Sequence, residues 1–80
     1  MRKVLYSKNA VADLLKYRSI AKRLKSKIDR YAETGAGDVR QIIGADEKRL
    51  RDGDFRIVFV ETETEIQVIK IAPRGRSYER

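Results

Sequence analysis

The side chains best suited to chemistry are arginines around one predicted β-hairpin, in the segment RLRDGDFRIVFV (residues 49–60). The pair Asp52-Gly53 is typical of a two-residue type I′ turn, in which both central residues need positive φ. With that turn, Arg49 lies directly opposite Arg56 across the hairpin. Like charges in this arrangement repel and destabilise the pair. A chain that keeps two arginines there is therefore expected to hold them for an anion.

Alternation along the two strands predicts one basic face and one apolar face. The apolar face carries Leu50, Phe55, Ile57 and Phe59. The basic face carries Arg49, Arg51, Arg56 and Val58, with Lys70 of the next strand expected beside them. The tail that follows adds Arg74, Arg76, Tyr78 and Arg80. Guanidinium groups suit phosphate because their planar fork donates two parallel hydrogen bonds. A nearby tyrosine can stack on a base or transfer a proton.

The composition fits a single compact domain over residues 1–80, with 41% hydrophobic and 39% charged residues. Cysteine and histidine are both absent, so disulfides are excluded and the usual zinc and iron ligand sets are missing. We therefore expect no metal site and no cofactor. No stretch is apolar for long enough to cross a membrane, and the amino terminus lacks the apolar run of a signal peptide. We expect a cytoplasmic protein.

The net charge of +7 is concentrated at the start of the chain. Residues 1–30 carry ten Lys/Arg and two acidic residues, whereas residues 31–60 carry five against six and residues 61–80 four against four. A basic patch indicates binding to a polyphosphate or to an acidic protein. The alternative is a solvated helical face that keeps a small protein soluble.

Two helices are predicted in this basic part, after a short edge strand at Lys3–Tyr6. Ser7 is a suitable N-cap for the first helix. We expect a break at residues 17–19, where Ser19 caps the second helix. Apolar side chains recur in that helix at near-four-residue steps, and Gly35 is a typical stop. Consecutive helices with a short connection form an antiparallel helical hairpin.

The second half of the chain is predicted to form an antiparallel sheet. Residues 38–46 are expected to be a connecting loop that tucks its apolar side chains under the sheet. Three strands follow, at about Glu47–Arg51, Phe55–Glu61 and Ile66–Ala72. Simple alternation in the last strand gives one face to Ile69 and Ile71 and the other to Val68 and Lys70. The predicted fold class is α+β, an N-terminal helical hairpin packed on an antiparallel β-sheet.

The hairpin segment, followed by a strand and a basic tail with a tyrosine, resembles the RelE/ParE toxin superfamily of bacterial toxin–antitoxin modules. The pattern RLR-x-G-x-[YF]-R-[IV]-[VI]-[YF] is fairly specific for the superfamily. The helical hairpin and the DVRQIIG segment (residues 38–44) fit its layout, so the likeness covers nearly the whole chain. It implies the RelE-like fold, in which two helices pack on a curved antiparallel sheet. It also implies a cognate antitoxin protein that covers the basic surface.

In RelE-like members the resemblance implies metal-independent cleavage of messenger RNA in the ribosomal A site. The ribose 2′-hydroxyl attacks the adjacent phosphate and leaves a 2′,3′-cyclic phosphate. Matched by position, Arg56 contacts the scissile phosphate, while Arg49 and Arg74 stabilise charge. Tyr78 resembles the tyrosine that stacks on or orients a base, and Glu47, where RelE has a lysine, is the candidate general base. The side chains expected to bind RNA around this site are Arg51, Lys70, Arg76 and Lys48.

Three functions are compatible with this resemblance. The first is an RNA-cleaving toxin, an endoribonuclease whose partners are its antitoxin and messenger RNA on the ribosome. The alternative is a ParE-type toxin that inhibits DNA gyrase without nuclease activity, which the absence of histidine and of a catalytic lysine favours. The third is a non-enzymatic binder that survives as an antitoxin partner. The presence of Arg56, Arg74 and Tyr78 favours the first function.

Overall fold

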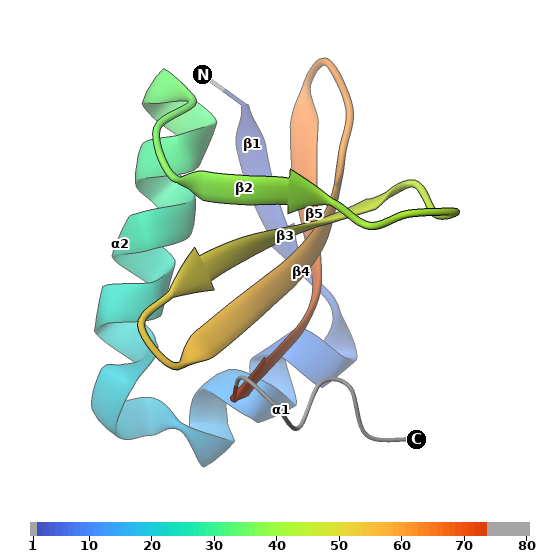
Figure 1. The fold of residues 1–80 in the computed structure, drawn as a ribbon. Helices are drawn as coiled ribbons and strands as arrows, with labels where there is room; N and C mark the ends of the chain where they lie inside the picture. Colours follow the sequence, from blue (N-terminus) through green and yellow to red (C-terminus); the bar gives the residue numbers. More distant parts are fainter. Residues whose placement is uncertain (1, 74–80) are drawn as a thin grey trace.

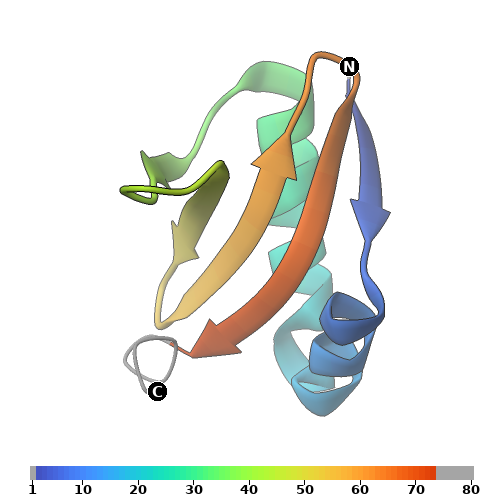
Figure 2. The ribbon, with the colours of Figure 1, turned by 90° about the vertical axis from the view of Figure 1, so that its right-hand side faces the viewer.

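The structure is a computed structural model that describes residues 2–73 of the chain. Its elements are β1 (Lys3–Tyr6), α1 (Lys8–Lys16), α2 (Arg18–Thr34), β2 (Asp38–Gln41), β3 (Glu47–Asp52), β4 (Phe55–Glu61) and β5 (Glu65–Pro73) (Figure 1). The strands form a five-stranded sheet in the order β1-β5-β4-β3-β2, and both helices pack on one of its faces (Figure 2). Neither helix between residues 2 and 73 is long and apolar enough to span a membrane.

The predicted α+β fold is confirmed, with one difference in strand direction. The three pairings β2–β3, β3–β4 and β4–β5 are antiparallel, whereas β1 runs parallel to β5. Parallel neighbours need a crossover connection, and here the helices and the other strands lie between them in the chain. The predicted N-terminal edge strand is therefore present, but it makes the sheet mixed.

The helices form as their caps and periodicity predict, but the junction between them is tighter. Ser7 caps α1 by accepting a hydrogen bond at 3.0 Å from an amide of the first turn. Gly35 ends α2 with a left-handed φ of 78°, which glycine adopts without steric cost. The predicted cap at Ser19 is wrong, because Tyr17 alone joins the two helices. The Tyr17 amide still bonds back into α1, so the chain enters α2 without a loop.

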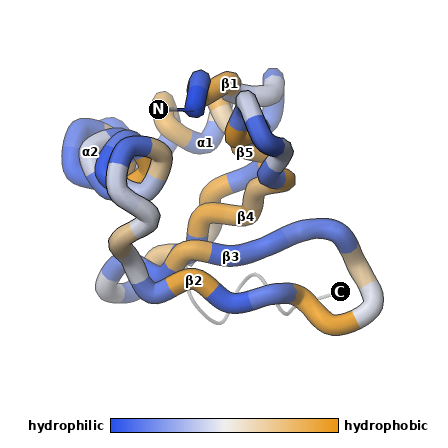
Figure 3. Tube along the Cα trace, turned by 90° about the horizontal axis from the view of Figure 1, so that it is seen from above, coloured by the Kyte–Doolittle hydropathy of each residue, from blue (hydrophilic) through white to orange (hydrophobic). Residues whose placement is uncertain are grey.

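The core lies between the helices and the sheet. Its fully buried large side chains are Phe59, Leu24, Ile28, Leu50, Ile57, Ile66 and Val68. Burying one such side chain stabilises the fold by roughly 1.5–3 kcal/mol, so this face of the sheet is firmly specified. The face of the sheet that the helices do not cover is called the open face below. In Figure 3, the trace of β4 is mostly in hydrophobic colours and that of β3 is largely in hydrophilic ones.

The β3–β4 turn lies one residue later than predicted. Asp52 pairs with Phe55, so Gly53 and Asp54 form the two-residue loop. Gly53 has a φ of 60°, and among the described residues no other residue type has positive φ. A type I′ turn is therefore excluded, and the geometry fits a type II′ turn with glycine first. Asp52 belongs to the strand because its buried carboxylate accepts a hydrogen bond from Arg23 of α2 at 3.1 Å.

This displacement of the turn changes the arginine pairing but keeps the two faces. The predicted pair of Arg49 with Arg56 is wrong, since Arg51 lies opposite Arg56 and Arg49 lies opposite Val58. The strands have slid past each other by two residues. Side chains alternate with a period of two, so each one stays on its predicted face.

Residues 38–46 do not form a loop tucked under the sheet. The first four are the edge strand β2, from which Val39 packs against the core. The rest is the connection to β3, which projects away from the body of the fold, and Ile43 within it is 99% exposed (Figure 1). The Gln41 side chain holds this connection by donating to the Ala45 carbonyl within it, at 2.8 Å, and to the Glu47 carbonyl at the start of β3, at 3.0 Å. The apolar residues of this segment suggested a buried loop. The course of the backbone is instead set by the alternation of β2 and by the tight turn that follows it.

β5 contains a bulge at Ile69, where its register with β4 changes by one residue. The additional residue reverses the alternation of side chains along the strand. Val68 and Ile71 therefore both face the core, and the prediction that Ile69 and Ile71 share a face opposite Val68 is wrong. Lys70 is exposed and lies on the open face.

Two side chains of the α1 region satisfy the backbone at this bulge. The Ser7 hydroxyl donates to the Ile69 carbonyl at 2.6 Å, and Asp13 Oδ2 accepts from the Ile71 amide at 2.8 Å. A bulge removes ladder partners from the backbone, and a buried polar group left unbonded costs about 1–3 kcal/mol. These two bonds therefore fix the course of β5 on its way to Pro73.

Candidate functional site

Two cross-strand rows of charged side chains lie on the open face of the sheet. In the first row, Arg40 of β2 lies opposite Arg49 of β3, and the row continues through Val58 of β4 to Lys70 of β5. Cations directly opposite each other destabilise a strand pair. Negative groups near such a row offset this repulsion.

The second row runs beside the first. Asp38 of β2 lies opposite Arg51 of β3, which in turn lies opposite Arg56 of β4. Arg51 is exposed, whereas Arg56 is only 4% exposed. The two rows thus contain two pairs of directly opposed arginines, one between β2 and β3 and one between β3 and β4.

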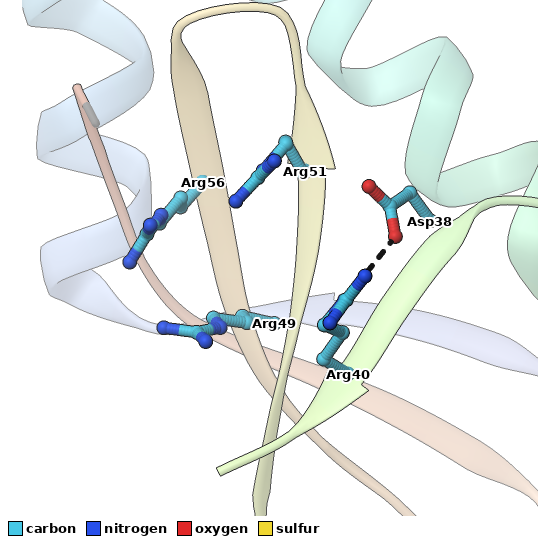
Figure 4. Close-up of a pocket in the computed structure, with 5 residues that line it drawn as sticks. All are labelled: Asp38, Arg40, Arg49, Arg51 and Arg56. Atoms are coloured by element: carbon cyan, nitrogen blue, oxygen red, sulfur yellow. Dashed lines mark ion pairs between the residues drawn. The ribbon is translucent and has the colours of Figure 1, made fainter.

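The two rows meet in a small hollow (Figure 4). It is lined by Asp38, Arg40, Arg49, Arg51 and Arg56. The space among these side chains is about 10 Å³, which is room for a single water molecule. A phosphate group is larger than this space and would have to lie across the mouth of the hollow to accept hydrogen bonds from the guanidinium groups of the three strands.

Of the predicted site residues, Arg49, Arg51 and Arg56 are brought together in this hollow, and Lys70 lies in the same row as Arg49. Glu47 does not line the hollow. It lies two residues before Arg49 on β3, and by strand alternation it shares the open face. The catalytic and RNA-binding roles of these side chains stay predictions.

Lys48 is not brought to the arginines. It alternates with Arg49 along β3 and points to the helix side of the sheet, where its Nζ lies 3.0 Å from Glu61 Oε1. Its predicted contact with RNA would need that ion pair to open. The structure gives this lysine a stabilising contact within the fold.

Glu61 is the centre of a network that the sequence did not reveal. Its side chain is 10% exposed and is bound by Lys48, by the Tyr31 hydroxyl at 2.6 Å and by Arg2 at 2.6 Å. Burial raises the pKa of Glu61, but the hydrogen bonds from Tyr31 and Lys48, with the charges of Lys48 and Arg2, outweigh it and leave the pKa below its usual value. Burial and the bond to Glu61 raise the pKa of Tyr31 to about 12. The network ties α2 and the start of the chain to the strands that carry the arginines.

The remaining predicted site residues lie outside the described residues. They are Arg74, Arg76, Tyr78 and Arg80. The described part of β5 ends with Ala72 opposite Arg56 and Pro73 opposite Phe55. The described chain therefore ends beside the arginine site, and the roles of the tail residues stay predictions.

Asp38 and Arg40 are the site residues that sequence reasoning missed. Both lie in the segment that was predicted to be a loop. Their signal is the polar–apolar alternation Asp38-Val39-Arg40-Gln41, which is typical of a half-buried strand. Read in that way, it places Asp38 and Arg40 on the face opposite the buried side of Val39.

No protein-family model matches the sequence, and no curated protein matches it either. Solved structures do. A chain of the RelB-RelE antitoxin-toxin complex from Methanococcus jannaschii is 26% identical, with 92% of this chain and 94% of that chain covered and a TM-score of 0.73. The archaeal RelE-RelB complex from Pyrococcus horikoshii OT3 gives 25% identity, 94% and 97% coverage and a TM-score of 0.77. The DinJ-YafQ toxin-antitoxin complex of E. coli is 10% identical, covers 98% of both chains with a TM-score of 0.78, and shows the fold alone.

These likenesses extend over nearly the whole of each chain, which is what a shared fold requires. The chain has the fold of the RelE/ParE toxin superfamily, and the resemblance drawn from the hairpin motif is confirmed. Within that superfamily it is RelE-like, since two helices and a five-stranded sheet are arranged as in the RelE and YafQ structures.

Proposed function

We propose that this protein is the toxin of a type II toxin–antitoxin system and acts in the cytoplasm as a metal-independent endoribonuclease on messenger RNA at the ribosome. The observation that carries the proposal is that four arginines of β2, β3 and β4 line one hollow: Arg40, Arg49, Arg51 and Arg56. Their guanidinium groups can donate paired hydrogen bonds to a phosphodiester that lies across the mouth of the hollow. The similarity to chains from antitoxin-toxin complexes supports the toxin part of the proposal.

The proposed reaction is attack of the ribose 2′-hydroxyl on the adjacent phosphate. It needs the attacking oxygen aligned with the phosphorus and the growing negative charge stabilised. Arg49 and Arg56 serve both needs by donating hydrogen bonds to the non-bridging oxygens. Arg74 supports the charge on the departing 5′-oxygen, and Tyr78 orients a base.

Glu47 is the proposed acceptor of the proton that the 2′-hydroxyl loses. It lies two residues from Arg49 along β3, a separation of about 7 Å along an extended strand. That spacing lets Arg49 hold the phosphate while Glu47 approaches the neighbouring ribose. The bond from phosphorus to the 5′-oxygen then breaks, and the 5′-oxygen takes up a proton.

The proposed partner is a cognate antitoxin that covers the basic surface. Residues 1–30, which form β1, α1 and most of α2, carry ten Lys/Arg against two acidic residues. An acidic partner segment is attracted to such a surface. No feature of residues 2–73 favours inhibition of DNA gyrase, and the similar structures named above are RelE and YafQ complexes, so we do not propose the ParE-type alternative.

The test is induction of the full chain in bacteria without an antitoxin, followed by primer extension on cellular messenger RNA. We expect growth to stop and cuts to appear within translated codons. Arg56→Ala and Arg74→Ala are expected to abolish both effects. Arg56 is only 4% exposed, so Arg56→Lys, which keeps the charge and loses the bidentate fork, serves as a second variant with less risk to folding.

The matched control is Arg30→Ala, which removes the same charge from the exposed surface of α2 and is expected to remain toxic. Normal growth with soluble wild-type protein present would exclude the toxin function. Full toxicity of both the Arg56 and Arg74 variants would exclude the arginine site. Intact transcripts together with cleaved or relaxed DNA would identify gyrase as the target.

A further inference from the structure

Among residues 2–73, one carboxylate lies among the arginines of the candidate site. Asp38 is the first residue of β2 and lies opposite Arg51 on β3. Its side chain points into the hollow beside Arg40, with Asp38 Oδ1 3.8 Å from Arg40 Nε (Figure 4). The other four described residues that line the hollow are arginines. Asp38 therefore occupies the position of a negative group in a site whose chemistry suits an anion.

The contact between Asp38 and Arg40 is loose. A charge-assisted hydrogen bond has a length of about 2.7–2.9 Å, and this pair is about an ångström longer. The two side chains are 52% and 71% exposed, and ion pairs so accessible to water contribute roughly 0–1 kcal/mol. A stronger anion can therefore displace the carboxylate at little cost.

We propose that Asp38 is an internal counter-ion of the arginine site, which competes with bound phosphate for Arg40 and Arg51. In the free protein its negative charge lies beside Arg40 and opposite Arg51 and offsets part of their positive charge. When a phosphate binds, the carboxylate turns away and the phosphate takes its place. Asp38 thus lowers the affinity of the site for anions and keeps the unoccupied site stable.

The competition follows from the geometry of the hollow alone, whereas RNA as the source of the phosphate rests on the proposed function. Two probes separate these statements. Inorganic phosphate tests the anion site by itself. A short single-stranded deoxyribonucleotide tests a phosphodiester, and it resists cleavage because it lacks the 2′-hydroxyl.

The experiment compares wild type, Asp38→Asn and a matched control, Asp46→Asn, each made as the full chain by chemical synthesis. Asp46 is exposed, lies in the connection between β2 and β3, and does not line the hollow, so its variant removes the same charge from the same hairpin. Removal of a carboxylate charge roughly 6 Å from a bound phosphate near the surface is expected to tighten binding about three- to tenfold at low salt. The control is expected to change it by less than about twofold, because solvent and salt screen a more distant charge.

Thermal denaturation gives a second readout. Without added anion, Asp38→Asn is expected to unfold at a slightly lower temperature than wild type, since the charges of Arg40 and Arg51 lose the nearby carboxylate. Added phosphate is expected to raise its unfolding temperature more than that of wild type, because a ligand stabilises the state it binds.

Equal or weaker binding of both probes by Asp38→Asn relative to Asp46→Asn would overturn the proposal, and so would no measurable binding by any of the three proteins. A selective loss of affinity in Asp38→Asn would make Asp38 a ligand-positioning residue instead. Tighter phosphate binding in Asp38→Asn by a chain that does not arrest growth would support the counter-ion and reject the toxin function. The two proposals therefore fail separately.

Discussion

The substitution Tyr31→Phe removes a single oxygen from the Glu61 network. In the wild type the Tyr31 hydroxyl donates to Glu61 Oε1 at 2.6 Å, and the ring packs on Phe59 with centroids 5.4 Å apart. Phenylalanine keeps the ring contact, so the loss is confined to the hydrogen bond. A hydrogen bond to a charged group contributes about 1.5–3 kcal/mol. Arg2 and Lys48 remain as partners of Glu61, so we expect the lower end, a loss of about 1.5 kcal/mol.

The expected loss depends on pH, with a definite sign. The pKa of Glu61 in the folded protein lies below its usual value. Its contribution to stability is therefore fully present above the unfolded pKa and is lost as the pH falls through the folded pKa. The difference between wild type and Tyr31→Phe should be full near pH 7 and smaller near pH 3. At the alkaline end, the pKa of Tyr31 is raised from 10.0 to about 12, so its contribution is present below pH 10 and disappears as the pH approaches 12.

Urea denaturation at neutral and acid pH measures these differences, and a thermal scan should show a fall in Tm of about 6–12 °C, since 1 kcal/mol corresponds to about 4–8 °C in a domain of this size. Tyr17→Phe is the control, because the Tyr17 hydroxyl makes no hydrogen bond within residues 2–73 and its ring meets Phe55 edge-on. It should cost less than about 0.5 kcal/mol. A Tyr31→Phe protein as stable as the control at neutral pH, or a loss of stability that grows on acidification, would show that the Tyr31 hydroxyl does not stabilise the fold through ionised Glu61.

Two further substitutions test other parts of the fold and site. Asp13→Ala leaves the buried Ile71 amide without its acceptor. We expect the free energy of unfolding to fall by about 1–3 kcal/mol and hydrogen exchange of that amide to become faster, with a smaller effect for Asp13→Asn. Unchanged hydrogen exchange in Asp13→Ala would contradict this hydrogen bond. Arg51→Gln removes one guanidinium group from the hollow, and we expect weaker binding of inorganic phosphate, with a difference from wild type that shrinks as salt is added. Phosphate binding as tight as in wild type would count against Arg51 as a phosphate ligand.

The sequence predicted which side chains share the open face, because that depends only on strand alternation. It did not predict which residues of β3 and β4 lie opposite each other. Asp52-Gly53 is a good turn sequence locally, but Asp52 is held in the strand by Arg23, which lies on a helix earlier in the chain. A local turn preference cannot include a contact with α2. The pairing therefore shifted by two residues, while Arg49, Arg51 and Arg56 stayed on their face.

The bulge in β5 escaped prediction for the same reason. It is satisfied by Ser7 and Asp13, which belong to the other end of the chain. Asp38 and Arg40 were missed because four residues of alternation in β2 were outweighed by the apolar residues that follow, including the exposed Ile43. Fold class and face composition were thus predictable, while features that depend on distant contacts required the structure.

The proposed function requires that the arginines on the open face bind an RNA phosphodiester and support its cleavage. The most direct measurement is to add purified wild type and Arg49→Gln to ribosomes translating a defined messenger RNA and to analyse the ends of the fragments. We predict codon-aligned fragments with 2′,3′-cyclic phosphate ends for wild type, and intact RNA for a folded Arg49→Gln protein. Intact RNA with wild type, or undiminished cleavage by Arg49→Gln, would contradict the proposed function.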